Sequence, residues 1–192
     1  MIKMNDKKRV LIIVLVFVLL IGGAYALYST LGSRVDAQRL AAQEEQSGET
    51  PEETPPLAPD FMMTDAEGNE AHLSDYIGKP IVLNFWASWC RPCKMEMPEF
   101  NEKYLELGDE VQFLMVNMTT SSRESLEKAK TLIAEQEYSF PVFYDTEGDA
   151  AETYGVYSLP TTIFIDAEGR AVAQATGAID AEILQTGIDM IK

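Results

Sequence analysis

The chain has 192 residues and a formal net charge of −16. This length suits one folded domain with accessory segments, and the acidic surplus argues against nucleic acid as a partner, because phosphates would be repelled. Two cysteines and one histidine are too few for a structural zinc site, which needs four nitrogen or sulfur ligands. We therefore expect an acidic domain with no metal and no other cofactor.

The N-terminal part predicts a membrane anchor. Residues 1–9 are basic, and residues 10–27 carry no charge, which approaches the roughly 20 residues of a membrane-spanning helix. Because a basic flank stays in the cytoplasm, the rest of the chain should face outward. A cleaved signal peptide is the alternative, since Ala24-Tyr25-Ala26 is a small-x-small cleavage pattern. Both interpretations predict export, and we expect a single-pass cell-membrane protein anchored by residues 10–31.

A tether and one domain should follow the anchor. Residues 32–56 are rich in glutamate and proline and almost free of large apolar side chains, so they cannot bury enough surface to fold. We expect this acidic linker to hold a domain near the membrane while leaving it free to turn. Residues 57–192 have the length of one domain and contain nine basic and 24 acidic residues, a net charge of −15.

The first half of this domain predicts a hairpin and then a strand–helix–strand unit. Residues 61–73 should form the hairpin around a glycine turn, followed by a short helical turn at 74–77. The apolar run at 81–87 is typical of a buried central strand. A helix over 91–107 and a strand over 111–118 follow, and this order predicts that the two strands run parallel.

The second half alternates the same kinds of element. A helix from about Arg123 to Glu137, with Ser121 or Ser122 as its cap, should be followed by a strand, a short helix, a hairpin and a last helix capped by Asp180. These elements are expected at residues 142–144, 150–154, 161–166, 171–176 and 181–191. The order predicts an α/β domain, a mixed sheet with helices on both faces.

Cys90 and Cys93, the only cysteines, stand where the predicted central strand gives way to a helix. A Cys-X-X-Cys pair at this position is typical of a dithiol/disulfide redox centre. The helix start supplies unpaired N–H groups and positive dipole, which favour a thiolate at Cys90, and Arg91 adds a positive charge. We expect Cys90 to be the exposed nucleophile and Cys93 to be the less exposed resolving thiol.

Two further residues have both a functional and an ordinary interpretation. Glu96 lies three residues beyond Cys93, on the same helix face. If buried, its carboxyl group would have a raised pKa and could exchange protons with Cys93; otherwise it is a solvated surface residue. Pro160 follows Leu159, and a cis bond there would offer a backbone edge to a substrate strand, whereas a trans bond would make it an ordinary turn residue.

These motifs resemble a known family. Residues 85–93, Phe-Trp-Ala-Ser-Trp-Cys-Arg-Pro-Cys, resemble the active-site segment of thioredoxins, and Leu159-Pro160-Thr161-Thr162 resembles the loop in which that family carries a cis-proline facing the disulfide. The front hairpin and the helix at 123–137 are similar to those of the TlpA/ResA branch, membrane-anchored thiol-disulfide oxidoreductases. The resemblance implies a thioredoxin-like fold over residues 57–192, with an N-terminal hairpin and an inserted helix.

The resemblance also implies roles for single residues. It makes Cys90, Cys93 and Glu96 catalytic. It further implies an active-site loop and a substrate-binding edge that contain Trp89, Arg91, Pro92, Leu159, Pro160 and Thr161. Asn84 stands where thioredoxins keep a buried aspartate, which leaves Glu96 as the available carboxylate for proton transfer.

The resulting expectation is a protein-disulfide reductase outside the cytoplasm. Its implied partners are exported proteins with a disulfide, apocytochrome c among them, and a membrane thiol-disulfide transporter as electron donor. An oxidase that forms disulfides would use the same two sulfurs, because direction depends on reduction potential. A thiol-based metal-binding module is a further alternative. Peroxidases of the peroxiredoxin kind place a lone attacking cysteine after Thr-x-x, a pattern that this chain lacks.

Overall fold

The computed structural model describes residues 54–192. The predicted basic tail, the anchor or signal peptide and the linker up to residue 53 lie outside this range. Within the described residues, no helix has the length and apolar character needed to cross a membrane.

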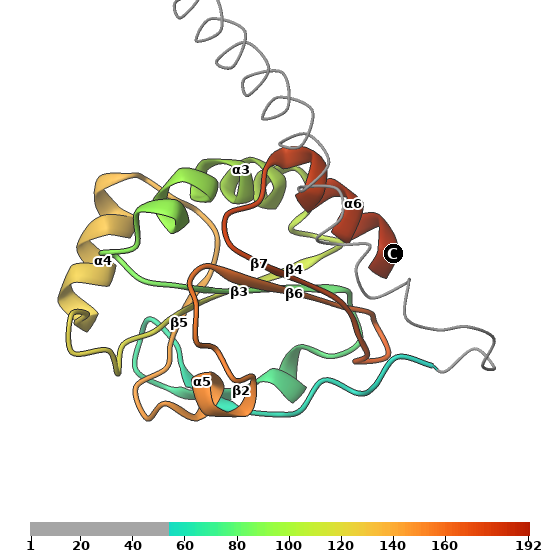
Figure 1. Cartoon of the computed structure of the whole chain (residues 1–192), viewed down its shortest axis with the longest axis horizontal. Coiled ribbons are helices and arrows are strands. Elements are labelled where there is room, and N and C mark those ends of the chain that lie inside the picture. Colours follow the sequence, from blue (N-terminus) through green and yellow to red (C-terminus); the bar gives the residue numbers. More distant parts are fainter. Residues whose placement is uncertain (1–53) are drawn as a thin grey trace, which may run out of the picture. The chain divides into compact units, whose positions relative to one another are not determined.

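A mixed seven-stranded sheet forms the centre of the domain, with the strand order β2-β1-β5-β4-β3-β6-β7 (Figure 1). The strands are β1 (Met62–Thr64), β2 (Glu70–His72), β3 (Ile81–Trp86), β4 (Gln112–Asn117), β5 (Val142–Tyr144), β6 (Thr161–Ile165) and β7 (Ala171–Thr176). As predicted, β3 and β4 are parallel. The neighbour of β3 on the other side, β6, is antiparallel to it, so the sheet is mixed.

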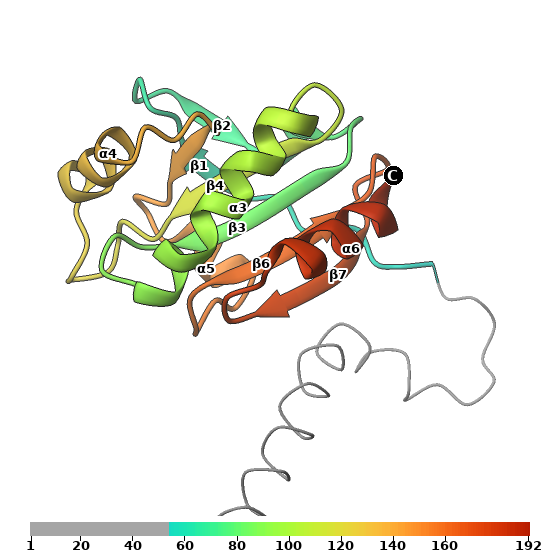
Figure 2. The ribbon, with the colours of Figure 1, turned by 90° about the horizontal axis from the view of Figure 1, so that it is seen from above.

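Helices cover both faces of this sheet. They are the 3-10 turn η1 (Leu73–Tyr76) and the α-helices α3 (Arg91–Leu107), α4 (Leu126–Glu135), α5 (Asp149–Thr153) and α6 (Ala181–Ile191). Figures 1 and 2 show α3 and α6 side by side on one face, with α5 on the other. The expected α/β architecture is therefore confirmed, and each predicted strand boundary lies within one residue of the observed one.

The central strand β3 is buried at all six positions, because helices or loops cover both of its faces. Successive side chains of a strand point to opposite faces. Leu83 and Phe85 belong to the hydrophobic core on the η1 and α5 side. Asn84, between them, faces α3 and α6 and is fully buried, so one polar residue is placed inside an otherwise apolar layer.

The helix predicted from 123 to 137 is shorter at both ends. It begins at Leu126, and its cap is Ser125, whose Oγ accepts from the backbone N–H of Lys128 at 3.3 Å. Residues before the cap stay in a loop because the Glu124 side chain is used in buried contacts with the loop that precedes Cys90. The helix ends at Glu135, before Glu137 takes a left-handed backbone conformation (φ 53°).

Candidate active site

Cys90 and Cys93 form a disulfide at the start of α3, with an S–S distance of 2.04 Å. Cys90 is the N-cap of the helix, and its Sγ accepts a hydrogen bond from the backbone N–H of Cys93 at 3.2 Å. Cys93 is fully buried, as expected for a resolving thiol, but Cys90 is only 4% exposed. The prediction of an exposed Cys90 is thus wrong for the disulfide form, because its side chain folds back over the first helical turn to reach Cys93.

The exposed part of the active-site loop consists of the residues around the cysteines. Arg91 and Pro92 are exposed in the first turn of α3, where a proline is tolerated because its missing N–H has no partner in a helix anyway. Trp89 is 36% exposed, and the guanidinium carbon of Arg123 lies 3.6 Å from its ring centroid. The arrangement is a cation–π contact.

The Leu159–Pro160 peptide bond is cis, as the resemblance implies. Pro160 is buried and Leu159 partly buried, while the Thr161 hydroxyl donates to the Ser158 carbonyl at 2.8 Å. Thr161 pairs with Phe85 across β6 and β3. Because β3 continues directly into the loop that holds Cys90, Pro160 and the disulfide lie at the same edge of the sheet.

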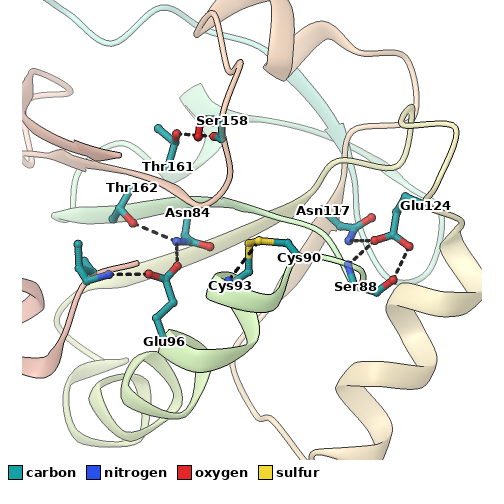
Figure 3. Close-up of a disulfide and its surroundings, with 11 residues drawn as sticks. Asn84, Ser88, Cys90, Cys93, Glu96, Asn117, Glu124, Ser158, Thr161 and Thr162 are labelled. Carbon is teal, nitrogen blue, oxygen red and sulfur yellow. Dashed lines mark hydrogen bonds between the residues drawn. A yellow bond between two sulfur atoms is a disulfide. The ribbon is translucent and has the colours of Figure 1, made fainter. Parts of the chain in front are cut away.

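Glu96 is buried, with 2% of its surface exposed, and Figure 3 shows it to one side of the disulfide, next to Asn84. Its Oε1 accepts from Nδ2 of Asn84 and its Oε2 from the backbone N–H of Ile179, each at 2.9 Å. Burial raises the pKa of Glu96 to about 7, and the hydrogen bonds from Ile179 and Asn84 offset part of this rise. The buried alternative for Glu96 is therefore the observed one, and the group can gain or lose a proton near neutral pH.

Asn84 connects this carboxyl group to the sheet. Its Nδ2 donates both to Glu96 and to the Thr162 hydroxyl, the latter at 3.0 Å. Its Oδ1, by contrast, has no hydrogen-bond donor among residues 54–192 and points toward the disulfide in Figure 3. A buried acceptor without a donor is costly, by about 1–3 kcal/mol, so this oxygen is available for a donor that the disulfide form does not supply.

A second buried carboxylate, Glu124, lies at the active site and was not anticipated from the sequence. It is 8% exposed and accepts from the Ser88 backbone N–H, from the Ser88 hydroxyl at 2.8 Å and from Nδ2 of Asn117 at 3.3 Å. Figure 3 shows Glu96 and Glu124 on opposite sides of the disulfide. An acid near a predicted helix start is normally solvated, and Ser88 is 36 residues away, so no local signal marks this contact.

The described residues show the chemistry that the site can support. No three His, Cys, Asp or Glu side chains of residues 54–192 come together in a way that would hold a metal ion. The groups that converge are a disulfide at a helix start, a carboxyl group that titrates near neutral pH and a backbone edge at Pro160. This combination suits thiol–disulfide exchange with a polypeptide.

Known proteins are similar to this chain in sequence and in fold. The model of the AhpC/TSA family matches residues 56–174. The thiol-disulfide oxidoreductase ResA of Bacillus cereus is 32% identical over 183 residues, which cover 93% of this chain and 94% of ResA. Among solved structures, the thiol:disulfide interchange protein DsbE from Chlorobium tepidum is 30% identical with a TM-score of 0.62 and covers 71% of this chain and 95% of its own. The exposed lipoprotein thioredoxin Etrx1 from Streptococcus pneumoniae is 38% identical with a TM-score of 0.60, covering 68% and 99%. The chain therefore belongs to the AhpC/TSA family and, within it, to the ResA/TlpA-like thiol-disulfide oxidoreductases.

Proposed function

We propose that this oxidoreductase works as a reductase of disulfides in exported proteins, outside the cytoplasm and tethered to the membrane by residues 10–31. The observation that carries the proposal is the buried Glu96, whose pKa of about 7 lies close to neutral pH, one turn beyond Cys93. The charge-free run at residues 10–27 supports the location. The similarity to ResA covers 93% of the chain and so extends beyond the folded domain.

The reaction uses the two sulfurs in sequence. The Cys90 thiolate attacks one sulfur of the substrate disulfide, forming a mixed disulfide and releasing the other substrate sulfur as a thiolate. Cys93 loses its proton and attacks Cys90 Sγ, which releases the second substrate thiol and leaves the Cys90–Cys93 disulfide. The dithiol is thereby oxidised by two electrons and the substrate reduced by two. Glu96 is the buried group that accepts the Cys93 proton.

In the reduced protein, Asn84 connects Cys93 with Glu96, the two groups between which the proton moves. Reduction creates an S–H donor at Cys93, and Asn84 Oδ1 is the buried acceptor that has no donor within the described part of the disulfide form. Because Asn84 also donates to Glu96 through Nδ2, one side chain then contacts both groups between which the proton moves. Asn84 acts here as a positioning residue for Glu96 and Cys93.

The direction of electron flow follows from how the site treats a thiolate. A strong oxidant stabilises its reduced form, chiefly through a thiolate of low pKa. At this site the helix start and Arg91 stabilise a Cys90 thiolate, which favours an oxidase, whereas the burial of Cys93 and the Glu96 carboxylate disfavour a thiolate at Cys93. We infer that the second effect prevails, because Cys90 is itself buried, so that burial and the Glu96 carboxylate act against a thiolate at either sulfur, and a buried charge is screened less than that of the exposed Arg91.

The reduction potential of the Cys90–Cys93 couple tests this proposal. A value near or below about −220 mV, from equilibration of the full chain with glutathione or dithiothreitol buffers, supports a reductase, whereas a value near about −120 mV supports the oxidase. A Cys93→Ala variant should in addition accumulate exported proteins as mixed disulfides on Cys90. Apocytochrome c is the specific candidate, and a trap that captures no exported protein would contradict the assigned substrate class.

A further inference from the structure

The surface around the disulfide differs in charge from the rest of the domain. Four segments meet at this edge of the sheet: residues 87–95, 118–123, 155–162 and 176–179. The first two follow the parallel strands β3 and β4, the third leads into β6, and the fourth follows β7; Gly177 N–H donates to the Pro160 carbonyl at 2.8 Å. Together these four segments contain three of the nine basic residues of residues 57–192 and none of the 24 acidic ones. Exposed acids stand just beyond them, at Glu147 and Asp149 after β5 and at Asp180 after the fourth segment.

The three basic residues, Arg91, Lys94 and Arg123, are all exposed. None of them forms a salt bridge within residues 54–192, where the ion pairs of basic residues involve His72, Lys103 and Lys192. The carboxylates closest in sequence, Glu96 and Glu124, are buried and hydrogen-bonded inside the domain. The positive charges are therefore not paired directly with an acid of the described residues.

Two of these charges stand where folding alone disfavours them. A helix N-terminus carries positive dipole, so acids are favourable and bases unfavourable in the first turn. The helices α4, α5 and α6 follow this rule with at least one acid in the first turn, whereas α3 has none and begins with Arg91. Lys94, which directly follows Cys93, is the second basic residue near the start of α3. Because these two positive charges lower the stability of α3, we expect that they serve the function of the active site.

The third charge is held in place from a different element. Arg123 belongs to the connection between β4 and α4, and its guanidinium group lies over the exposed Trp89 ring. The next residue, Glu124, holds Ser88, the neighbour of Trp89. Two consecutive residues of one loop thus bind two consecutive residues of the other. A guanidinium fixed on an aromatic ring loses little further freedom when it pairs with a carboxylate.

From these observations we infer that Arg91, Lys94, Arg123 and Trp89 form a cationic rim that binds acidic side chains flanking the disulfide of a polypeptide substrate. The inference rests on the proposed reductase function and names its substrate class. At about 0.15 M salt, charges more than about 8 Å apart are screened, so the rim acts on groups beside the reacting sulfurs while the net charge of the domain has little effect on them. Acidic flanks should therefore speed the attack by Cys90.

Three synthetic disulfide peptides, identical except for aspartate, serine or lysine beside the two cysteines, test the inference. The reduced full-length chain in an uncharged detergent is mixed with each peptide, and the rate constant for oxidation of Cys90 and Cys93 is measured. We expect the aspartate peptide to react about tenfold faster than the lysine peptide at about 0.15 M salt, and the ratio to fall toward one at about 1 M salt.

Variants separate substrate recognition from thiol reactivity. Arg123→Gln should lower the aspartate-to-lysine ratio about threefold, the size expected for one exposed charge pair; because both rates are measured on the same variant, a change in the reactivity of Cys90 cancels from this ratio. Lys79→Gln is the matched control, because Lys79 precedes the opposite end of β3 and donates to the Asp109 carbonyl; it should change neither this ratio nor the rate with uncharged hydroxyethyl disulfide. Equal rates for the three peptides would overturn the cationic rim and leave the reductase function standing. Failure to reduce hydroxyethyl disulfide and every peptide would overturn both.

Discussion

Glu96 has its whole side chain inside the domain, yet its pKa of about 7 allows both charge states near neutral pH. The two hydrogen bonds from Asn84 and Ile179 suit the carboxylate, while burial favours the neutral acid. These opposing effects leave the group able to exchange a proton in either direction. A solvated glutamate, with an ordinary pKa near 4.5, would be a poor acid at the pH where thiols react.

Replacing this residue should remove a pH dependence. The folded-state pKa of Glu96 is raised from 4.5 to about 7, so its favourable contribution to stability is present below pH 4.5 and is lost as the pH rises through 7. Between about pH 4 and pH 8 the free energy of unfolding of the wild type should therefore fall by up to about 3 kcal/mol relative to Glu96→Gln. Denaturant unfolding of both oxidised proteins over this range measures the difference.

The same variant should alter the thiols. In the wild type, the rate at which iodoacetamide alkylates the reduced protein should show an inflection near pH 7 that Glu96→Gln lacks. Glu99→Gln, three residues further along α3, is the matched control. Parallel profiles for wild type and Glu96→Gln would show that the carboxyl group and the cysteines titrate independently.

At the scale of elements, the start of α4 and the loop before Cys90 behave as one unit. The inserted helix lies far from the cysteines in sequence, but Arg123 and Glu124, in the loop just before α4, contact Trp89 and Ser88. The Asn117 amide, at the end of β4, joins the same carboxylate. The insertion thus supports the active-site loop from the side opposite Glu96.

Glu124→Gln should loosen this connection. A glutamine offers one acceptor oxygen where the carboxylate has two, and its amide would face the N–H of Ser88, so one buried donor loses its partner at a cost of about 1–3 kcal/mol. We expect the free energy of unfolding to fall by that amount and the amide hydrogen of Ser88 to exchange faster. Glu127→Gln, at an exposed acid in the first turn of the same helix, should leave the exchange at Ser88 unchanged and lower the free energy of unfolding by less than about 1 kcal/mol, because it loses only a favourable interaction with the helix dipole. Unchanged exchange at Ser88 in Glu124→Gln would show that the loop holds its position unaided.

On the scale of the whole molecule, most acidic residues of the domain lie away from the reactive disulfide. The acids of the domain favour its solubility and repel polyanions, while the four segments that flank the disulfide contain no acidic residue. This separation lets one strongly acidic domain still attract acidic segments at the one place where it reacts. It is also compatible with the proposed membrane tether, which would bring partners to the domain at short range.

The proposed topology predicts where the thiols are accessible. In intact cells that produce the Cys93→Ala variant, a membrane-impermeant maleimide should label Cys90 after mild reduction, because the domain lies outside the cytoplasm. The label should remain with the membrane fraction if residues 10–31 are retained as an anchor. Labelling that requires prior lysis of the cells would place the domain inside and contradict the proposal.

The sequence by itself determined the order of the elements and the reaction class. The apolar run of β3, the Cys-X-X-Cys at its end and the alternating strand and helix patterns are local, and a local pattern is enough to form a strand, a helix start or a hairpin. The start of α4 was misplaced because Ser121, Ser122 and Ser125 are equally good caps by local rules. A contact with Ser88, distant in sequence, selects among them.

Only the tertiary structure decided which polar groups are buried and what they bind. Spacing placed Glu96 on the face of Cys93 but left its burial open; burial follows from the packing of α3 against β3 and from the Ile179 backbone, 83 residues away. The same holds for Glu124 and for Arg123 over Trp89. A carboxyl group's pKa and a cation's availability depend on which distant groups surround it, and only the folded chain brings those groups together.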